Sequence, residues 1–201
     1  MHNTFKKIVF IFIGLSLTSI FCGCEGPAPS QTAHFNIDSL ITLQVVDLSA
    51  LHASLMKAGT INAVKQDTVL TELDTTAWRR ELDIFSEIEL FNKPAYRVSY
   101  EVNDGLRDAS SNLTIRAFQT TEDLPVRYVK LFYLDNLNKL RKIEALYQQD
   151  NALMKTQRKL VMEFSDVYNK NILTSYSVEG GQKMFAGDSV HFVINGTVTF
   201  N

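Results

Sequence analysis

The feature that most constrains the fold is a change in hydrophobic period near Pro94. Before it, apolar residues recur at helical spacing; after it, apolar and polar residues alternate in short segments separated by turn-forming residues. Helices followed by a run of strands indicate the α+β class. We expect N-terminal amphipathic helices packed on a curled antiparallel β-meander of about 6–8 strands.

Two helices are predicted. The first covers residues 35–59, is capped by Asn36 or Asp38 and ends at Gly59. Its apolar stripe is formed by Ile37, Ile41, Val45, Leu48, His52 and Leu55. We expect His52 to be a half-buried core residue, because no second histidine lies four residues away.

The second helix is predicted at residues 74–91, with Thr75 or Thr76 at its start. Its apolar face is formed by Trp78, Leu82, Phe85 and Ile88. Asp83, Glu87 and Glu89 lie off that face. The geometry of a calcium loop is missing, so we expect these acids to be solvated.

The strands follow from the two-residue period. A hairpin in residues 60–73 is expected to turn at Gln66-Asp67, and a strand is expected over residues 95–102, with Pro94 ending all helix before it. The other predicted elements are a loop at 103–112, strands at 113–120 and 126–134, a long hairpin folding near Asp150-Asn151, a turn at Gly180-Gly181 and a last strand at 189–200.

The N-terminus has the pattern of a secretory signal. Lys6 and Lys7 precede an uncharged apolar run over residues 8–21, which is short for a permanent membrane span. The chain's two cysteines follow as "FCGC", and Gly23 is the small residue that cleavage before Cys24 requires. A disulfide across a single residue would be strained, and a zinc site needs further Cys or His ligands at defined spacings.

"FCGC" resembles a lipobox, the processing motif of bacterial lipoproteins. The resemblance implies that Cys24 becomes the first residue of the mature chain and carries lipid that anchors it to the membrane. The predicted organisation is a signal peptide at 1–23, a lipidated cysteine and tether at 24–34, and one α+β domain at 35–201. We expect the protein to lie in the outer membrane and to face the periplasm. Lipoproteins exported to the cell surface often carry several acidic residues after the cysteine, whereas here only Glu25 follows it.

A second resemblance rests on "WRRELDIFSEIELFNKPAYRVSY". Its pattern of Trp, Glu-Leu, Phe, Asn-Lys-Pro-Ala and Tyr resembles uncharacterised envelope lipoproteins of Bacteroidota. The residues that carry it are Trp78, Glu81, Leu82, Phe85, Asn92, Lys93, Pro94, Ala95 and Tyr100. The predicted layout is also loosely similar to the lipoprotein-carrier fold, a half-barrel with helices in its mouth.

Charge and motifs exclude several function classes. Without Lys6 and Lys7 the chain has 18 basic and 22 acidic residues, a net charge of −4, which argues against nucleic acid. We find no nucleophile elbow, H-E-x-x-H, P-loop or C-x-x-C motif, and His34, His52 and His191 are scattered. We therefore expect a non-enzymatic protein without a cofactor or metal.

Two functions stay open. In one, the domain binds a lipid or other hydrophobic ligand; in the other, it is a structural module of an envelope protein complex. The candidate aromatic residues, which line a ligand cavity in the first case and form ordinary core in the second, are Trp78, Phe85, Tyr96, Tyr100, Phe132 and Phe192.

The long hairpin also carries a cluster of basic residues. Its members are Lys139, Arg141, Lys142, Lys155, Arg158 and Lys159. On a membrane-tethered domain, such a cluster is a candidate surface for anionic headgroups. The alternative is an ordinary solvated hairpin whose lysines protect a sheet edge.

Overall fold

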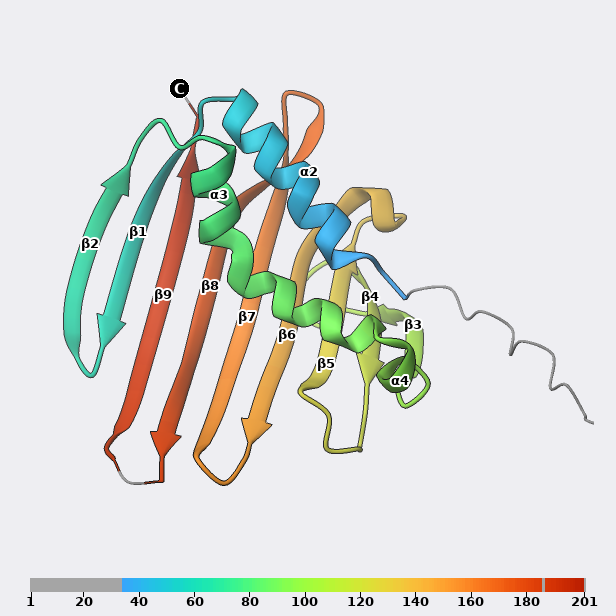
Figure 1. Ribbon diagram of the computed structural model, residues 1–201. Helices are drawn as coiled ribbons and strands as arrows, with labels where there is room; N and C mark the ends of the chain where they lie inside the picture. Colours follow the sequence, from blue (N-terminus) through green and yellow to red (C-terminus); the bar gives the residue numbers. More distant parts are fainter. Residues whose placement is uncertain (1–33, 186, 201) are drawn as a thin grey trace, which may run out of the picture. The chain divides into compact units, whose positions relative to one another are not determined.

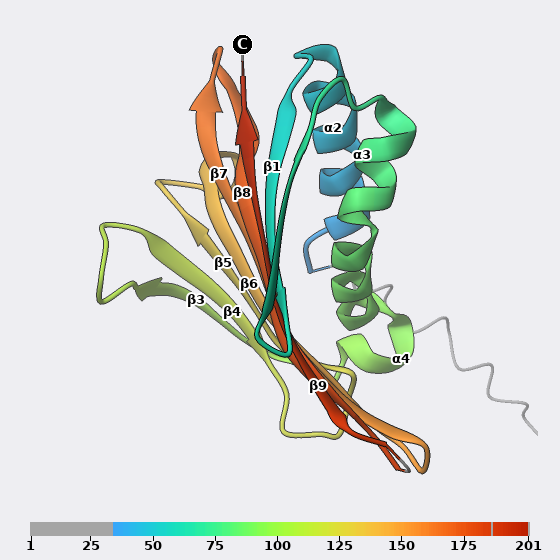
Figure 2. The same ribbon diagram turned by 90° about the vertical axis from the view of Figure 1, so that its left-hand side faces the viewer.

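The computed structural model describes residues 34–185 and 187–200. They form one antiparallel sheet with helices on one of its faces (Figures 1 and 2). The helical elements are α2 (Ile37–Ala50), α3 (Thr75–Leu82), the 3₁₀ helix η1 (Asp83–Asn92), α4 (Pro94–Arg97) and the 3₁₀ turn η2 (Leu137–Lys139). The strands are β1 (Ser54–Ile61), β2 (Val64–Leu70), β3 (Glu101–Arg107), β4 (Thr114–Gln119), β5 (Val126–Tyr133), β6 (Leu140–Asp150), β7 (Met154–Val167), β8 (Lys170–Met184) and β9 (Ser189–Thr199).

The nine strands follow the order β2-β1-β9-β8-β7-β6-β5-β4-β3. The strands from β3 to β9 form a meander, and β1 joins it beside β9. The chain passes from β2 at one edge to β3 at the other through α3, η1 and α4, which cross one face of the sheet (Figure 1). The α+β class is confirmed, the sheet is unclosed, and the expected number of strands was too low.

One missed strand lies inside the first predicted helix. That helix ends at Ala50, and β1 begins at Ser54 and runs through Gly59. His52 has φ of 48° and is exposed, so the prediction of a half-buried helical residue was wrong. A residue in the left-handed region ends a right-handed helix. Leu55 is fully buried, but from a strand.

The β1–β2 hairpin turns at Asn62-Ala63, not at Gln66-Asp67. Asn62 and Ala63 have φ of 46° and 70°, as a type I′ hairpin turn requires. The Asn62 side chain also accepts a hydrogen bond from the backbone N–H of His191 at 2.9 Å. Gln66 and Asp67 pair with Gly59 and Ala58 in the middle of the hairpin.

The strand predicted at 95–102 was wrong over residues 95–100. Pro94 opens the short helix α4, because its fixed φ and missing N–H suit a first helical turn. The backbone N–H groups of Tyr96 and Arg97 donate to Lys93 O, and Val98 is 66 % exposed. Strand β3 starts at Glu101 and extends into the predicted loop at 103–112.

The later strands agree better with the sequence. β4, β5 and the β6–β7 hairpin lie where they were predicted, with the turn directly after Asp150. The predicted turn at Gly180-Gly181 was wrong, because β8 runs through both glycines to Met184. Gly180 is paired with Arg158 and Gly181 with His191, side chains that need the space a Cβ would occupy.

The helix layer buries a regular apolar stripe against the sheet. Trp78, Leu82, Phe85 and Ile88 are fully or almost fully buried, as predicted. From Leu82 the buried residues recur every third position to Phe91, and a 3₁₀ helix has three residues per turn. This spacing keeps the stripe on one face, so the predicted α-helix becomes η1 after Leu82. The N-cap of α3 is Asp74, not Thr75 or Thr76.

The acids of η1 differ in their surroundings. Asp83 is exposed, as predicted, but Glu87 and Glu89 are half-buried. Glu87 forms an ion pair with Arg158, and Glu89 accepts hydrogen bonds. Glu89 Oε2 accepts a hydrogen bond from the backbone N–H of Ile37 at 2.8 Å. This carboxylate lies at the N-terminus of α2, where a negative charge is favourable. It joins the start of α2 to η1.

Candidate functional site

A cleft of about 330 Å³ opens between the helix layer and the sheet. It forms because β7, β8 and β9 extend past α3 and η1, which cross them diagonally (Figure 1). Even-numbered residues of β8 and β9 face the helices here. Tyr176 and Val178 are buried, whereas Gln182, Phe192 and Ile194 are partly exposed. The residues that line this helix–sheet cleft are Lys57, Arg80, Glu81, Ile84, Thr156, Arg158, Tyr176, Val178, Gln182, Phe192 and Ile194.

A hydrogen-bonded group on Glu81 forms the polar end of the cleft. Glu81 Oε1 accepts hydrogen bonds from Lys57 Nζ at 2.7 Å and from the hydroxyl of Tyr176. The Glu81 side chain is 14 % exposed, so its charge depends on these donors rather than on water. Burial, and next the hydrogen bond to Glu81, raise the pKa of Tyr176, which keeps the phenol a neutral donor.

Arg158 provides a second cation beside the cleft. Its Nη1 donates to Glu87 Oε1 at 3.1 Å and lies 3.0 Å from Oε2, while its guanidinium lies 4.8 Å from the Tyr147 ring centroid. Burial raises the pKa of Glu87, and Arg158 opposes this shift. A Cβ on Gly180 would lie 3.0 Å from Arg158 Cγ and 2.3 Å from Gln157 O. The glycine therefore leaves room for Arg158.

Four of the eleven residues that line the cleft are apolar. Ile84 contributes from η1, Val178 from β8, and Phe192 and Ile194 from β9. Arg80 is exposed at the mouth, and no hydrogen bond or ion pair involves its side chain among the described residues. Apolar walls with few convergent polar groups are typical of small-ligand sites. With a free guanidinium at the mouth, this arrangement suits an amphipathic ligand with an acidic group.

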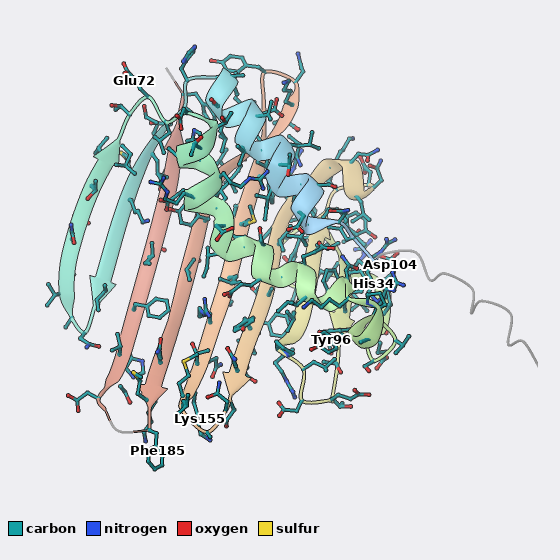
Figure 3. The ribbon with its side chains drawn as sticks, in the orientation of Figure 1. His34, Glu72, Tyr96, Asp104, Lys155 and Phe185 are labelled. Atoms are coloured by element: carbon teal, nitrogen blue, oxygen red, sulfur yellow. The ribbon has the colours of Figure 1, made fainter. Side chains whose placement is uncertain are left out.

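The structure separates the six candidate aromatic residues. Trp78, Phe85 and Tyr100 lie in the core, where Phe85 packs edge-on to Tyr176 at 5.6 Å between ring centroids. Phe132 lies on the helix-free face beneath Lys142, whose Nζ is 3.9 Å from the ring centroid. Tyr96 lies on α4, away from the cleft (Figure 3). Only Phe192 of the six lines the cleft.

The predicted basic cluster does not form one surface. Arg158 faces the helices, and Lys159, its neighbour along β7, faces the opposite side. Five of the six cations pair with acids, namely Lys139 with Asp135, Arg141 with Asp166, Lys155 with Asp150, Arg158 with Glu87 and Lys159 with Glu144. The hairpin also lies in the middle of the sheet, so its lysines do not protect an edge.

Sequence reasoning missed most of the cleft. Lys57 was placed on a helix, although it lies on β1, and Glu81 was noted only for the family resemblance. Tyr176, Val178 and Gly180 lie at every second position of β8, and this two-residue period is the sequence signal that could have placed them on one face. No pattern relates this strand to Lys57 or Glu81, because those contacts are tertiary.

Other kinds of site were sought in residues 34–185 and 187–200. Within them, no group of three or more His, Cys, Asp and Glu residues has the geometry to hold a metal ion. None of the described helices is long and apolar enough to cross a membrane. Comparisons with protein-family models, with curated proteins and with solved structures find no match. Cys24 and the predicted signal lie outside the described residues.

Proposed function

We propose that this chain is a bacterial envelope lipoprotein, anchored through lipid on Cys24, whose domain binds an amphipathic ligand in the helix–sheet cleft. The anchor rests on the lipobox and the apolar run before it. The ligand class rests on the cleft, with apolar walls at Ile84, Val178, Phe192 and Ile194 and a free guanidinium on Arg80. The proposed role is binding rather than catalysis, because the sequence carries none of the catalytic motifs that were sought.

The size of the cleft limits the ligand. A volume of about 330 Å³ is near the lower end of the range for small-ligand sites. The centre of the helix–sheet interface is occupied by Trp78, Leu82 and Phe85, so the ligand does not extend beneath the helices. A single acyl chain with a carboxylate or phosphate group fits better than a whole phospholipid. Arg80 is the expected partner of that acidic group.

Native mass spectrometry of the Cys24→Ser chain, purified without detergent, tests ligand binding. We expect an added mass that leaves on denaturation and matches a fatty acid or related lipid. Ile194→Glu should remove the adduct by placing a charge on the apolar wall. Val193→Glu is the matched control, since Val193 is the next residue of β9 and faces the opposite side. A bare mass for the Cys24→Ser chain without further changes would contradict the proposed ligand.

The anchor is tested separately in a bacterial host. The parent chain should incorporate labelled palmitate and sediment with the outer membrane. Cys24→Ser should abolish the labelling, whereas Cys22→Ser should leave it unchanged. Labelling that survives Cys24→Ser would contradict the assignment of the lipidated residue.

A partner-binding role is the alternative, and the β1–β2 hairpin favours it. Four large apolar side chains are exposed there, namely Met56, Ile61, Val64 and Val69. Strand β2 is also an edge, so its outer N–H and C=O groups are available to another strand. A photo-crosslinking amino acid at Val69 should then capture a specific protein in cells, and one at the exposed Leu43 of α2 should not.

A further inference from the structure

A second hollow lies at the helix-free face of the sheet, with a volume of about 820 Å³. Its lining comes mainly from β6, β7, β8 and β9 toward the ends of the two long hairpins, and it includes Lys155 (Figure 3). The helix–sheet cleft lies on the other side of these strands. The hollow shares only Thr156 and Gln182 with that cleft.

One row of residues across the sheet explains the hollow. Gln148 on β6 pairs with Gln157 on β7, Gln157 with Gly181 on β8, and Gly181 with His191 on β9. Side chains rise from the sheet on both sides of Gly181, which has none. A Cβ on Gly181 would lie 3.0 Å from His191 Nδ1 and 3.2 Å from Cε1, so the imidazole leans over the glycine. The imidazole therefore occupies the space above Gly181, and the Gln148 and Gln157 side chains lie beside it in the same row.

The charges of this polar hollow are balanced. Its acids and its lysines are equal in number, and they are Asp123, Asp150, Glu179, Lys155, Lys159 and Lys183. Lys155 pairs with Asp150 at 2.6 Å, and Lys159 pairs with Glu144 beside the hollow at 3.3 Å. Without an excess of either sign, the hollow lacks the field that would concentrate a phosphate, a polyanion or an anionic membrane surface.

Uncharged amides provide the remaining polar groups. Four glutamines line the hollow, namely Gln148, Gln149, Gln157 and Gln182. Among the described residues, the side-chain amides of Gln148 and Gln157 make no hydrogen bond. An amide offers donors and acceptors together, and a sugar hydroxyl does the same. Tyr128 and His191, at opposite sides of the lining, add ring surfaces.

We infer that the polar hollow binds an uncharged oligosaccharide. The Gln148 and Gln157 amides bond the sugar hydroxyls, the His191 imidazole forms the floor over Gly181, and the lysines and acids form the rim. This site is independent of the helix–sheet cleft and of its proposed lipid ligand. An envelope domain of this kind would hold glycan on one face of its sheet.

Binding of defined sugars to the purified full-length chain tests the inference. The probes are neutral hexasaccharides of glucose, mannose, xylose and N-acetylglucosamine, together with a uronic acid hexasaccharide of equal length. Saturation-transfer NMR detects binding, and titration gives the Kd. We expect at least one neutral hexasaccharide to bind, more tightly than the uronic acid chain.

Paired variants locate the site. Gln148→Ala with Gln157→Ala should weaken binding about tenfold, as expected for the loss of several hydrogen bonds. Gln66→Ala with Gln119→Ala should leave the Kd unchanged, because those two exposed glutamines lie outside the hollow. Thermal unfolding of each variant confirms that it is folded. His191→Ala, which removes the imidazole over Gly181, provides a second test and should also weaken binding.

Three results would overturn the inference. They are no binding of any neutral hexasaccharide, tighter binding of the uronic acid chain, and a Kd that the Gln148 and Gln157 variant does not change. A lipid adduct in the helix–sheet cleft would be unaffected by each of them, so the two sites are tested separately.

Discussion

The ring of Tyr176 on β8 covers Gly196 on β9, the residue paired with it across the two strands. A Cβ built on Gly196 would lie 2.1 Å from Tyr176 Cε1 and 2.3 Å from Cζ. The glycine thus allows the tyrosine to lie flat against β9 and to donate its hydroxyl hydrogen to Glu81. Packing at one strand pair fixes the polar end of the helix–sheet cleft.

Gly196→Ala should destabilise the fold by roughly 1–3 kcal/mol, the usual cost of overpacking a core. The added methyl displaces the Tyr176 ring and breaks its hydrogen bond to Glu81. Gly59→Ala on β1 is the control, because its Cβ would lie at an ordinary 3.7 Å from Gln66 O. That change should be neutral or stabilise by up to about 1 kcal/mol. Urea unfolding followed by the fluorescence of Trp78 measures both, and equal effects would contradict the packing argument.

Gln44→Met should cost roughly 1–3 kcal/mol of unfolding free energy, because it leaves buried backbone groups without partners. Gln44 is 3 % exposed; its Oε1 accepts from Leu173 N at 2.7 Å and its Nε2 donates to Asn171 O at 3.1 Å. Methionine has a similar length but makes neither bond. Gln66→Met on the exposed strand β2 should change the free energy by less than about 0.5 kcal/mol. Similar urea midpoints for the two variants would count against the docking role of Gln44.

Stability should fall at alkaline pH. Burial raises the pKa of Tyr100 and of Tyr128 to about 12, so the fold favours their neutral forms. The unfolded chain releases these protons near the ordinary tyrosine pKa of about 10. The stabilisation is therefore complete below pH 10 and lost as the pH approaches 12. We expect a lower urea midpoint above pH 10 than at pH 9.

Tyr100→Phe should reduce this alkaline loss, although the variant is less stable at neutral pH because the hydroxyl donates to Val126 O at 2.5 Å. Tyr168→Phe should leave the loss unchanged, since Tyr168 is exposed in the turn between β7 and β8. A pH dependence that is identical in Tyr100→Phe and in the parent chain would refute the assignment to Tyr100.

The basic residues of the β6–β7 hairpin should not direct membrane binding. In the unlipidated Cys24→Ser chain, we expect Lys139, Lys155 and Lys159 changed together to Glu to leave sedimentation with anionic vesicles unchanged. Each of these lysines is paired with an acid, and exposed pairs of this kind contribute about 0–1 kcal/mol. A control changes Lys65, Lys93 and Lys170 to Glu. Loss of vesicle binding in the first variant alone would show that the hairpin contacts the membrane.

The predictions from sequence were correct where the hydrophobic period of a single segment decides its structure. Alternation placed β4, β5 and the β6–β7 hairpin, and helical spacing identified Trp78, Leu82, Phe85 and Ile88 as buried. They were wrong where a short polar segment adopts a left-handed backbone conformation. His52 and Asn62 have positive φ, and no hydrophobic period indicates that a helix ends or a hairpin turns at such residues.

The sequence by itself determined the α+β class, the buried stripe from Trp78 to Ile88 and most strands after Tyr100, because each depends on periodicity within one segment. Only the tertiary structure decided that β1 pairs with β9, which brings Lys57 next to Glu81 and Tyr176. It likewise decided that β8 runs straight through Gly180 and Gly181. Glycine is required at both positions because the Arg158 and His191 side chains on neighbouring strands occupy the space of a Cβ. Contacts of this kind between distant segments leave no period in the sequence.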